Sequence, residues 1–245
     1  EDGPSVGLEN SGAAYVFERD ASGTWTEVAV LRASNAGGAD RFGISVAING
    51  DRAIVGAYRK DGPSGGLSGS GAAYVFERDA SGTWGTSDPG GVQTETALLR
   101  ASNAGFGDNF GISVAIEGDR AIVGAWGEAG GSGAAYVFER DASGTWGTPA
   151  SGGFQTETAL LRASNSDTND YFGYSVAINS DRAIVGAWGE DGPSDGLAAG
   201  AAYVFEREAG GTWTEVALLR ASNAGESDSF GESVAIDGDR ALVGA

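Results

Sequence analysis

Large and small side chains alternate along a short segment that recurs four times in the chain. In its first occurrence, the large residues Phe42, Ile44, Val46 and Ile48 are separated by single small residues. An alternation with a period of two predicts a β-strand. We expect the small face of this strand to let a neighbouring sheet approach closely, while the large face fills the space on the other side.

The residues around this segment predict three more strands in each unit, and no segment has a helical pattern. Asn49-Gly50 follows the first strand and is typical of a two-residue hairpin, so the second strand should return beside it. The third strand has apolar side chains on both faces, which predicts a covering layer on each side. We label the predicted strands A (Phe42–Ile48), B (Ala53–Ala57), C (Ala13–Arg19) and D (Trp25–Ala33).

Long identical strings make the whole chain a tandem repeat. The string SGAAYVFERDASGTW occurs unchanged from Ser11, Ser70 and Ser132, and a close variant begins at Ala199. The string that contains strands A and B begins at Phe42, Phe110, Phe172 and Phe230, at spacings of 68, 62 and 58 residues. A meander that is apolar on both faces must stack on copies of itself. Radial stacking of such meanders makes a β-propeller.

The predicted fold is therefore all-β, a propeller of four four-stranded antiparallel blades in one domain, residues 1–245. The chain starts with strands C and D and stops after a strand B, so we expect its two ends to pair and complete one blade. The predicted blades are 230–245 plus 1–35, 42–103, 110–165 and 172–223. Because the units are nearly identical, an alternative is half of an eight-bladed or larger ring, a homo-oligomer made by exchange of blade strands between chains.

Charge and composition narrow the function. The chain has 34 acidic and 15 basic residues, a net charge of −19, and a surface this acidic repels nucleic acid and anionic membranes. Such a surface tolerates high salt, which suggests a halophilic source. No apolar run is long enough for membrane insertion. The chain has no histidine and no cysteine, which excludes Ser–His–Asp and Cys–His catalysis, so we expect a protein that is not an enzyme.

Strand direction alternates within a blade, so the D–A and B–C loops should share one rim. Every D–A loop has an aspartate two residues before the phenylalanine that opens strand A: Asp40, Asp108, Asp170 and Asp228. These carboxylates would either form a ring that binds cations or cap their own turns, and we favour the caps.

The B–C loops are the most variable part of the repeat and supply the candidate ligand-binding residues Tyr58, Trp126, Trp188, Asp61 and Asp191. Aromatic side chains next to loops can stack on sugars or anchor a partner protein. The alternative is that the two tryptophans cover the blade packing beneath them. The tryptophans that open strand D in every unit are expected to be packing residues.

The pattern FG-x-SVA, followed after four residues by A-I/L-VGA, resembles the FG-GAP repeats of integrin α-chains and bacterial surface proteins. The resemblance covers essentially the whole chain and implies a propeller, an extracellular or cell-surface location, and adhesion or ligand binding. Two features depart from the family. Tyr58, Trp126 and Trp188 stand where the family has proline, and the DxDxDG calcium loop between strands A and B is absent, so no cofactor is expected there.

Three functions remain open at this point. The first is a non-enzymatic extracellular binding or adhesion module that contacts a protein or glycan ligand through the rim of D–A and B–C loops. The second is a structural or self-assembling unit of a larger surface protein. The third is a carbohydrate-binding propeller.

Overall fold

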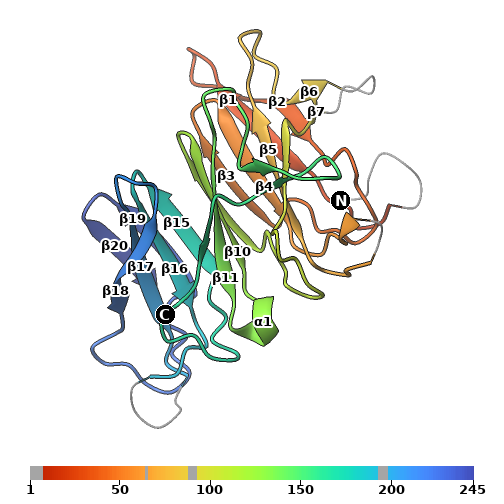
Figure 1. Cartoon of the computed structure of the whole chain (residues 1–245). Helices are drawn as coiled ribbons and strands as arrows, with labels where there is room; N and C mark the ends of the chain where they lie inside the picture. The colour runs from red at the N-terminus through yellow and green to blue at the C-terminus, as the bar shows by residue number, and fades with distance from the viewer. Residues whose placement is uncertain (1–7, 64–65, 88–92, 193–197) are drawn as a thin grey trace.

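The chain folds into a stack of antiparallel sheets (Figure 1), seen in a computed structural model that describes residues 8–63, 66–87, 93–192 and 198–245. Three blades have all four strands. Blade 1 contains β3 (Ser45–Asn49), β4 (Arg52–Ala57), β5 (Ala72–Glu77) and β8 (Ala97–Leu99). Blade 2 contains β9 (Ser113–Glu117), β10 (Arg120–Ala125), β11 (Ala134–Glu139) and β14 (Ala159–Leu161). Blade 3 contains β15 (Ser175–Asn179), β16 (Arg182–Ala187), β17 (Ala201–Arg207) and β18 (Trp213–Leu219).

Two incomplete blades stand at the ends of the stack. The N-terminal half-blade is the hairpin of β1 (Ala14–Arg19) and β2 (Trp25–Leu31), which correspond to strands C and D. The C-terminal half-blade is the hairpin of β19 (Ser233–Asp237) and β20 (Arg240–Gly244), which correspond to strands A and B. The four strands of the predicted repeat are therefore all present, with slightly different ends.

Two of these differences have a local cause. Strand A begins at Ser45 rather than at Phe42, because Phe42 forms a single-residue bridge with Gly12 of the preceding unit and Gly43 has a φ of +91°. The A–B hairpin turns at residues 50 and 51 instead of at Asn49 and Gly50, since Asn49 pairs with Arg52. A helical turn, α1 (Glu128–Gly131), was not expected from the sequence.

Consecutive blades pack face to face through apolar side chains. The core between blades 1 and 2 contains Ile54 from β4 and Val114, Tyr136 and Phe138 from blade 2. Phe110 lies edge-to-face against Tyr136, with 5.3 Å between the ring centroids. Strands β3, β9, β15 and β19 are consecutive neighbours, so strand A of each blade contacts strand A of the next.

The small residues of strands A and B let the backbones of neighbouring blades meet, which confirms the expected close approach. Ser45 Oγ donates a hydrogen bond of 2.8 Å to the carbonyl oxygen of Gly111 in the next blade. A Cβ atom on Gly56 would lie only 2.0 Å from that oxygen. The same contact recurs at the next two interfaces, where Ser113 reaches Gly173 and Ser175 reaches Gly231.

The segments inserted before strand D in blades 1 and 2 form small hairpins on the outer edge of the preceding sheet. Strands β6 (Thr86–Ser87) and β7 (Gln93–Thr94) extend the N-terminal half-blade, where Gln93 pairs in parallel with Leu31. Strands β12 (Thr148–Pro149) and β13 (Gln155–Thr156) extend blade 1 in the same way. Each insertion therefore ties its own blade to the one before it.

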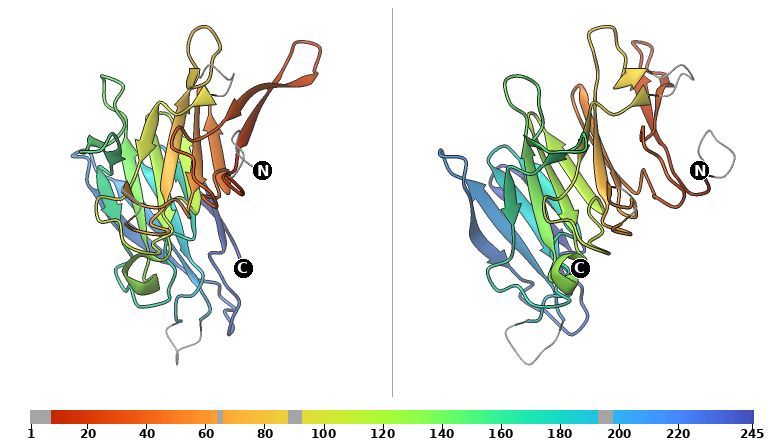
Figure 2. Two further views of the ribbon diagram at one scale, coloured as in Figure 1. Left: turned by 90° about the vertical axis from the view of Figure 1, so that its right-hand side faces the viewer. Right: turned by 45° about the vertical axis from the view of Figure 1, so that its right-hand side comes forward.

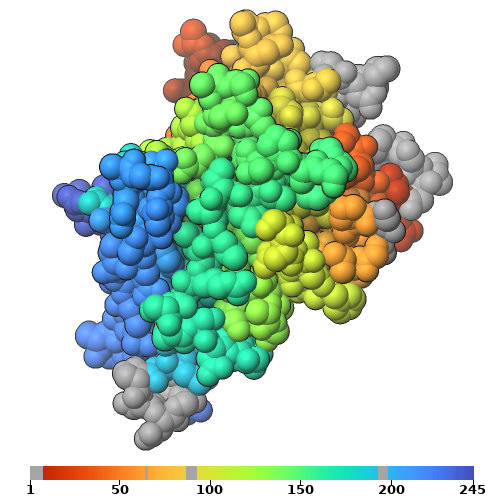
Figure 3. All heavy atoms as spheres, in the orientation of Figure 1, coloured from red at the N-terminus to blue at the C-terminus, as the bar shows by residue number. Residues whose placement is uncertain are grey.

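The predicted ring closure is not present in this structure. In the described residues, β1 pairs only with β2, and β20 pairs only with β19. The two half-blades lie at opposite ends of the stack in Figures 1 and 2, and the blue C-terminal segment forms one flank of the surface in Figure 3. The described residues thus form five stacked sheets, three complete blades between two half-blades, and the closed ring stays unconfirmed.

Candidate binding surface at the loop rim

The aspartates of the D–A loops bind the backbone of their own turns. Each carboxylate accepts a hydrogen bond of 2.5–2.6 Å from the N–H three residues earlier, at Asp40, Asp108, Asp170 and Asp228. This is the capping contact that the sequence suggested. In the described part of the chain, no three acidic side chains come together as a cation site would need. Binding of a cation by these aspartates stays a prediction.

A buried polar network supports each loop pair from below. In blade 2, the Tyr136 hydroxyl donates to Asn103 (3.0 Å), and Asn103 Nδ2 donates to Glu128 Oε1 (3.0 Å). Arg162 binds both oxygens of Glu128 at 2.7 Å. Blade 3 repeats the network with Tyr203, Asn165, Glu190 and Arg220. Sequence reasoning missed these residues, although the recurring LRASN and WGE strings contain them.

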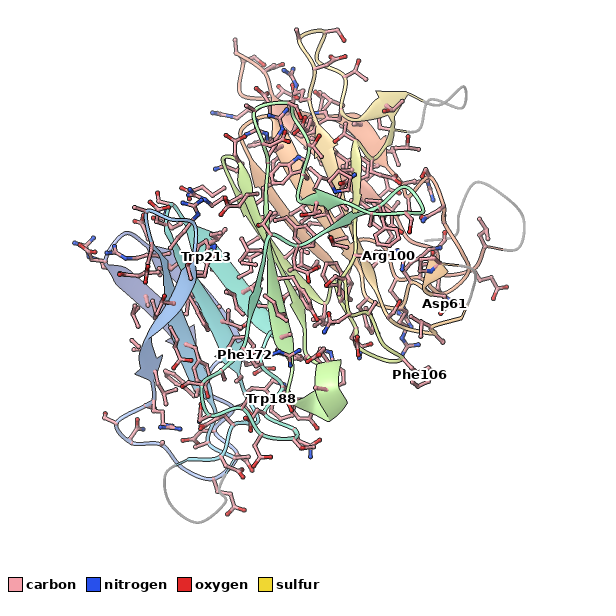
Figure 4. The ribbon with its side chains drawn as sticks, viewed as in Figure 1. Asp61, Arg100, Phe106, Phe172, Trp188 and Trp213 are labelled. Carbon is pink, nitrogen blue, oxygen red and sulfur yellow. The ribbon has the colours of Figure 1, made fainter. Side chains whose placement is uncertain are left out.

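Blade 1 reverses the charge in this network. Lys60, the only lysine of the chain, stands where the other blades have Glu128 and Glu190. Its Nζ lies 2.9 Å from Asp40 Oδ2. Arg100 then donates to the carbonyl oxygen of Asp61 (2.9 Å), and the two residues are neighbours in Figure 4. The Asp61 carboxylate accepts from the backbone of residue 69 (3.1 Å) and so stabilises its own loop.

Burial changes the ionisation of the corresponding aspartates of blades 2 and 3. Burial raises the pKa of Asp108 above its ordinary value, and the nearby charge of Glu128 adds to the increase. Burial likewise raises the pKa of Asp170, with further contributions from Glu190, Asp167 and Asp191. The rim of blade 3 is therefore a region of concentrated negative charge.

Four aromatic rings form a continuous group on this rim, which we call the aromatic row. Tyr171 stacks on Trp188, with ring centroids 4.8 Å apart and planes at 20°. Trp126 makes an edge-to-face contact with Tyr171 (5.2 Å), and Tyr174 makes one with Trp188 (6.0 Å). Trp188 lies beside α1 in Figure 4, so the row joins the B–C loops of blades 2 and 3.

The structure thus links Trp126 and Trp188 through Tyr171, whereas Tyr58 and Asp61 belong to the B–C loop of blade 1. Tyr58 lies under the guanidinium group of Arg59, 5.5 Å from the ring centroid. Asp191 is exposed, and its backbone pairs with Ala198 at the base of the loop. None of these contacts tests ligand binding, which stays a prediction for all five residues.

Sequence reasoning missed the two tyrosines of the row. Tyr171 takes a position held by Arg41, Asn109 and Ser229 in the other units, and all four residues have a positive φ. Tyr174 replaces an isoleucine or glutamate. The signal was available as a departure from the repeat, because only the third unit has aromatic residues at both positions.

Comparison with protein families agrees with this architecture. The FG-GAP repeat matches residues 25–76, 93–138, 155–205 and 213–245. Comparison with curated proteins finds no match. Within the described residues, no helix has the length and apolar character needed to cross a bilayer. The four matched segments cover most of the chain, which therefore belongs to the FG-GAP repeat family.

Proposed function

We propose that this chain is a non-enzymatic extracellular binding module that takes a protein ligand at the aromatic row. The observation that carries the proposal is the contact of Trp126, Tyr171 and Trp188 across two blades. Aromatic residues supply much of the energy of protein interfaces when they cluster on a rigid support. Here the loops rise from two packed sheets, which limits the entropy lost on binding.

The backbone of Tyr171 supports a functional origin of the row. Its φ of +57° lies in the left-handed region, which is uncommon for a bulky residue. The corresponding residue of blade 2 is Asn109, a type that adopts this conformation with less strain. Arg41 and Ser229 also have a positive φ, so the repeat imposes this backbone, and only the third unit uses it to present an aromatic ring in contact with two tryptophans.

The charge around the row indicates the chemistry of the ligand. The exposed Asp167 and Asp191 both act electrostatically on Asp170, which directly precedes Tyr171 of the row. Acidic groups around an apolar centre favour a basic partner and accelerate its approach at low salt. The ligand that fits is a protein segment with an apolar anchor between lysine or arginine residues.

Two further observations support this choice over the alternatives. The absence of histidine and cysteine removes the usual nucleophile–base pairs, and Glu128 and Glu190 are already engaged by arginines. Sugar binding needs an open ring face, whereas Trp188 covers one face of Tyr171 and the Trp126 edge lies against the same ring. An extracellular location is the one that the family resemblance implies.

The proposal is tested with peptides selected from a displayed random library on the immobilised chain at low salt. A selected synthetic peptide is then titrated against the wild-type protein, Tyr171→Asn and the control Tyr58→Asn. Tyr171→Asn removes the centre of the row and installs the residue type that blade 2 tolerates. We expect its Kd to rise at least about tenfold, roughly 1.4 kcal/mol, whereas Tyr58→Asn leaves Kd unchanged.

The experiment has two further parts, which measure the salt dependence of peptide affinity and binding on a glycan array. Affinity for the basic peptide should fall as salt increases, because the flanking acids become screened. A peptide that binds wild type and Tyr171→Asn equally would contradict the proposed surface. Strong binding on a glycan array that Tyr171→Asn removes would reject a protein ligand in favour of a carbohydrate.

A further inference from the structure

An apolar groove lies beside the N-terminal half-blade. It has a volume of about 460 Å³ and is lined by Ala14, Val16, Leu31, Val46, Ile48 and Ile54, among others. Val46 is 61% exposed there, whereas the equivalent Val114 of blade 2 is 9% exposed. Both valines belong to the same position of the repeat. At the interface between blades 1 and 2 another strand covers this position, whereas beside the N-terminal half-blade the corresponding place is the open groove.

That strand can be identified from blade 1. Strand β5 is the counterpart of β1, and its edge is covered by β4, whose Ile54 packs against Val114 and Ile116. The sequence of β4 is RAIVGA, and residues 240–245 read RALVGA. In β20, Leu242 takes the place of Ile54 but is 75% exposed, whereas Ile54 is fully buried. The chain therefore carries both a groove for this hairpin and the hairpin itself.

We propose that the β19–β20 hairpin of a second copy of this chain fills the groove, so that two copies form one closed ring. Strand β20 of one copy would pair antiparallel with β1 of the other in the register of β4 and β5. That register places Arg240 opposite Glu18, Leu242 opposite Val16 and Gly244 opposite Ala14, as Arg52, Ile54 and Gly56 stand opposite Glu77, Val75 and Ala73. Leu242 would then cover Val46 and Ile48.

Polar groups at the two ends of the stack are also complementary. At formed interfaces, a glutamate of strand C accepts from the arginine and tryptophan of the next blade, as Glu77 does from Arg140 and Trp146. The same repeat positions would set Glu206 of one copy against Arg19 and Trp25 of the other. Trp25 is exposed in the single chain, whereas Trp84 and Trp146 are buried.

A second repeated contact points to the same pairing. The N–H and hydroxyl of Ser34 donate to Glu95 of the next blade at 2.9 and 2.6 Å, and Ser102 and Ser164 bind Glu157 and Glu215 in the same way. The fourth members of the series are Ser222 and Glu27, at opposite ends of the stack. In the two-copy ring, Ser222 of one copy meets Glu27 of the other.

The arrangement of the blades favours a second copy over closure within one chain. The half-blades lie apart at the two ends of the stack, so closure of a single chain would require the four formed interfaces between successive sheets to change their angle. Those interfaces are fixed by backbone approaches such as Ser45 to Gly111. Two copies leave them intact, and the resulting eight blades lie within the usual range for propellers. The two contacts between the copies are identical and head-to-tail, and together they complete a closed ring.

The first test is the solution mass of the whole 245-residue chain by light scattering over a range of concentrations. We expect twice the 24.6 kDa of one chain. A single-chain mass at every concentration would overturn the proposal, and so would a mass that grows beyond two chains. Val46→Asp in the groove and Leu242→Asp in the hairpin should each give single chains, because both side chains are exposed before association.

Mixing the two variants separates a blocked contact from misfolding. Equal amounts of the Val46→Asp and Leu242→Asp chains should regain a two-chain species, since one groove and one hairpin remain intact. Phe106→Asp is the matched control, because Phe106 is exposed on a rim loop away from the groove (Figure 4), and it should keep the mass of wild type. Failure of the mixture to associate would contradict the proposed pairing.

A disulfide tests the register directly. In β4 and β5, the Asp51 carbonyl accepts from the Arg78 N–H, so the Ile54–Val75 pair is of the close, non-hydrogen-bonded type. Cysteines at the corresponding positions, Val16→Cys with Leu242→Cys, should oxidise to a covalent two-chain species. Phe17→Cys with Leu242→Cys is the control, because Phe17 points to the opposite face. A monomeric product in the first variant, or equal cross-linking in both, would reject the register.

Discussion

Arg140 Nε lies 2.7 Å from Oε1 of Glu77, and this contact joins blade 2 to blade 1. Trp146 Nε1 donates to the same oxygen at 3.0 Å. Burial raises the pKa of the Glu77 carboxyl, but the hydrogen bonds from Arg140 and Trp146 outweigh burial and hold that pKa below its ordinary value. Arg78 binds Glu18, and Arg207 binds Glu139, in the same way at the neighbouring interfaces.

The substitution Glu77→Gln should therefore weaken the interface between these two blades. Because the Glu77 side chain is 24% exposed, solvent screens part of the interaction, and we expect a loss of about 1 kcal/mol in the free energy of unfolding. Urea denaturation measures it. Glu208→Gln removes the same charge from an exposed turn and should change the free energy little; equal losses in both variants would contradict a role for the interblade contact.

Gly124 should not tolerate a side chain. A Cβ atom at this position would lie 1.8 Å from the carbonyl oxygen of Gly173 in the next blade. We expect Gly124→Ala to lose more than about 2 kcal/mol of stability or to fail to fold, as judged by circular dichroism and urea denaturation. Gly210→Ala is the control because its Cβ would meet no atom within 4 Å. A fully stable Gly124→Ala would show that the blades stand further apart.

Asp108 should make stability depend on pH with a sign opposite to that of an aspartate whose pKa is lowered in the folded state. Its folded-state pKa is raised, so the protein gains stability as pH falls through that pKa and loses this gain as pH rises. Asp108→Asn lacks this titration and can still accept from Gly105. The stability of the variant relative to wild type should increase with pH across the window above the ordinary Asp value, as measured by thermal unfolding.

Asp141 supplies the contrasting measurement. Hydrogen bonds from Ser143 and Thr145 lower the pKa of its carboxyl. Its contribution to stability is therefore present above the ordinary Asp value and is lost as pH falls through the lowered pKa. Asp141→Asn should lose stability relative to wild type at neutral pH, and the loss should shrink in acid. Parallel pH profiles for the two variants would refute the assignment.

Lys60 should be needed for the stability of blade 1 because it neutralises buried Asp40. Lys60→Gln leaves that carboxylate without its cationic partner, and we expect a loss of about 1–3 kcal/mol. Adding Asp40→Asn to Lys60→Gln should recover most of the loss, which a double-mutant cycle of urea denaturation curves measures. Additive losses would mean that the two residues act independently.

Much of the fold could be predicted from the sequence because it depends on local pattern. The alternation around Val46 predicts strand A, and repetition predicts stacking. The string at Ala13–Arg19 predicts a strand covered on both faces, which is confirmed for its counterparts β5 and β11, whereas β1 leaves Tyr15 and Phe17 exposed. Trp84 and Trp146 are buried as expected of packing residues, whereas Trp25 in the N-terminal half-blade is exposed. The parallel pairing of Gln93 with Leu31 could not be predicted, since it joins an insertion to a different blade through one residue pair.

Ring closure and the aromatic row could not be predicted from the sequence, for a related reason. The number of blades in a ring depends on the angle between packed sheets, and contacts such as Ser45 to Gly111 set that angle in three dimensions. The link between Trp126 and Trp188 runs through the ring of Tyr171, which contacts both and comes from a different loop. Neither feature has a periodic signature along the chain.

Three of the four segments that match the family run from a strand D to the following strand C, and the fourth, 213–245, runs from a strand D to a strand B. Each segment therefore straddles two blades. A gene duplication that copies such a segment also copies a complete interface between two blades, together with the strands on either side of it. Adding one unit to the protein would require no new contact surface to evolve, because the copied interface is already complementary to the adjacent blades.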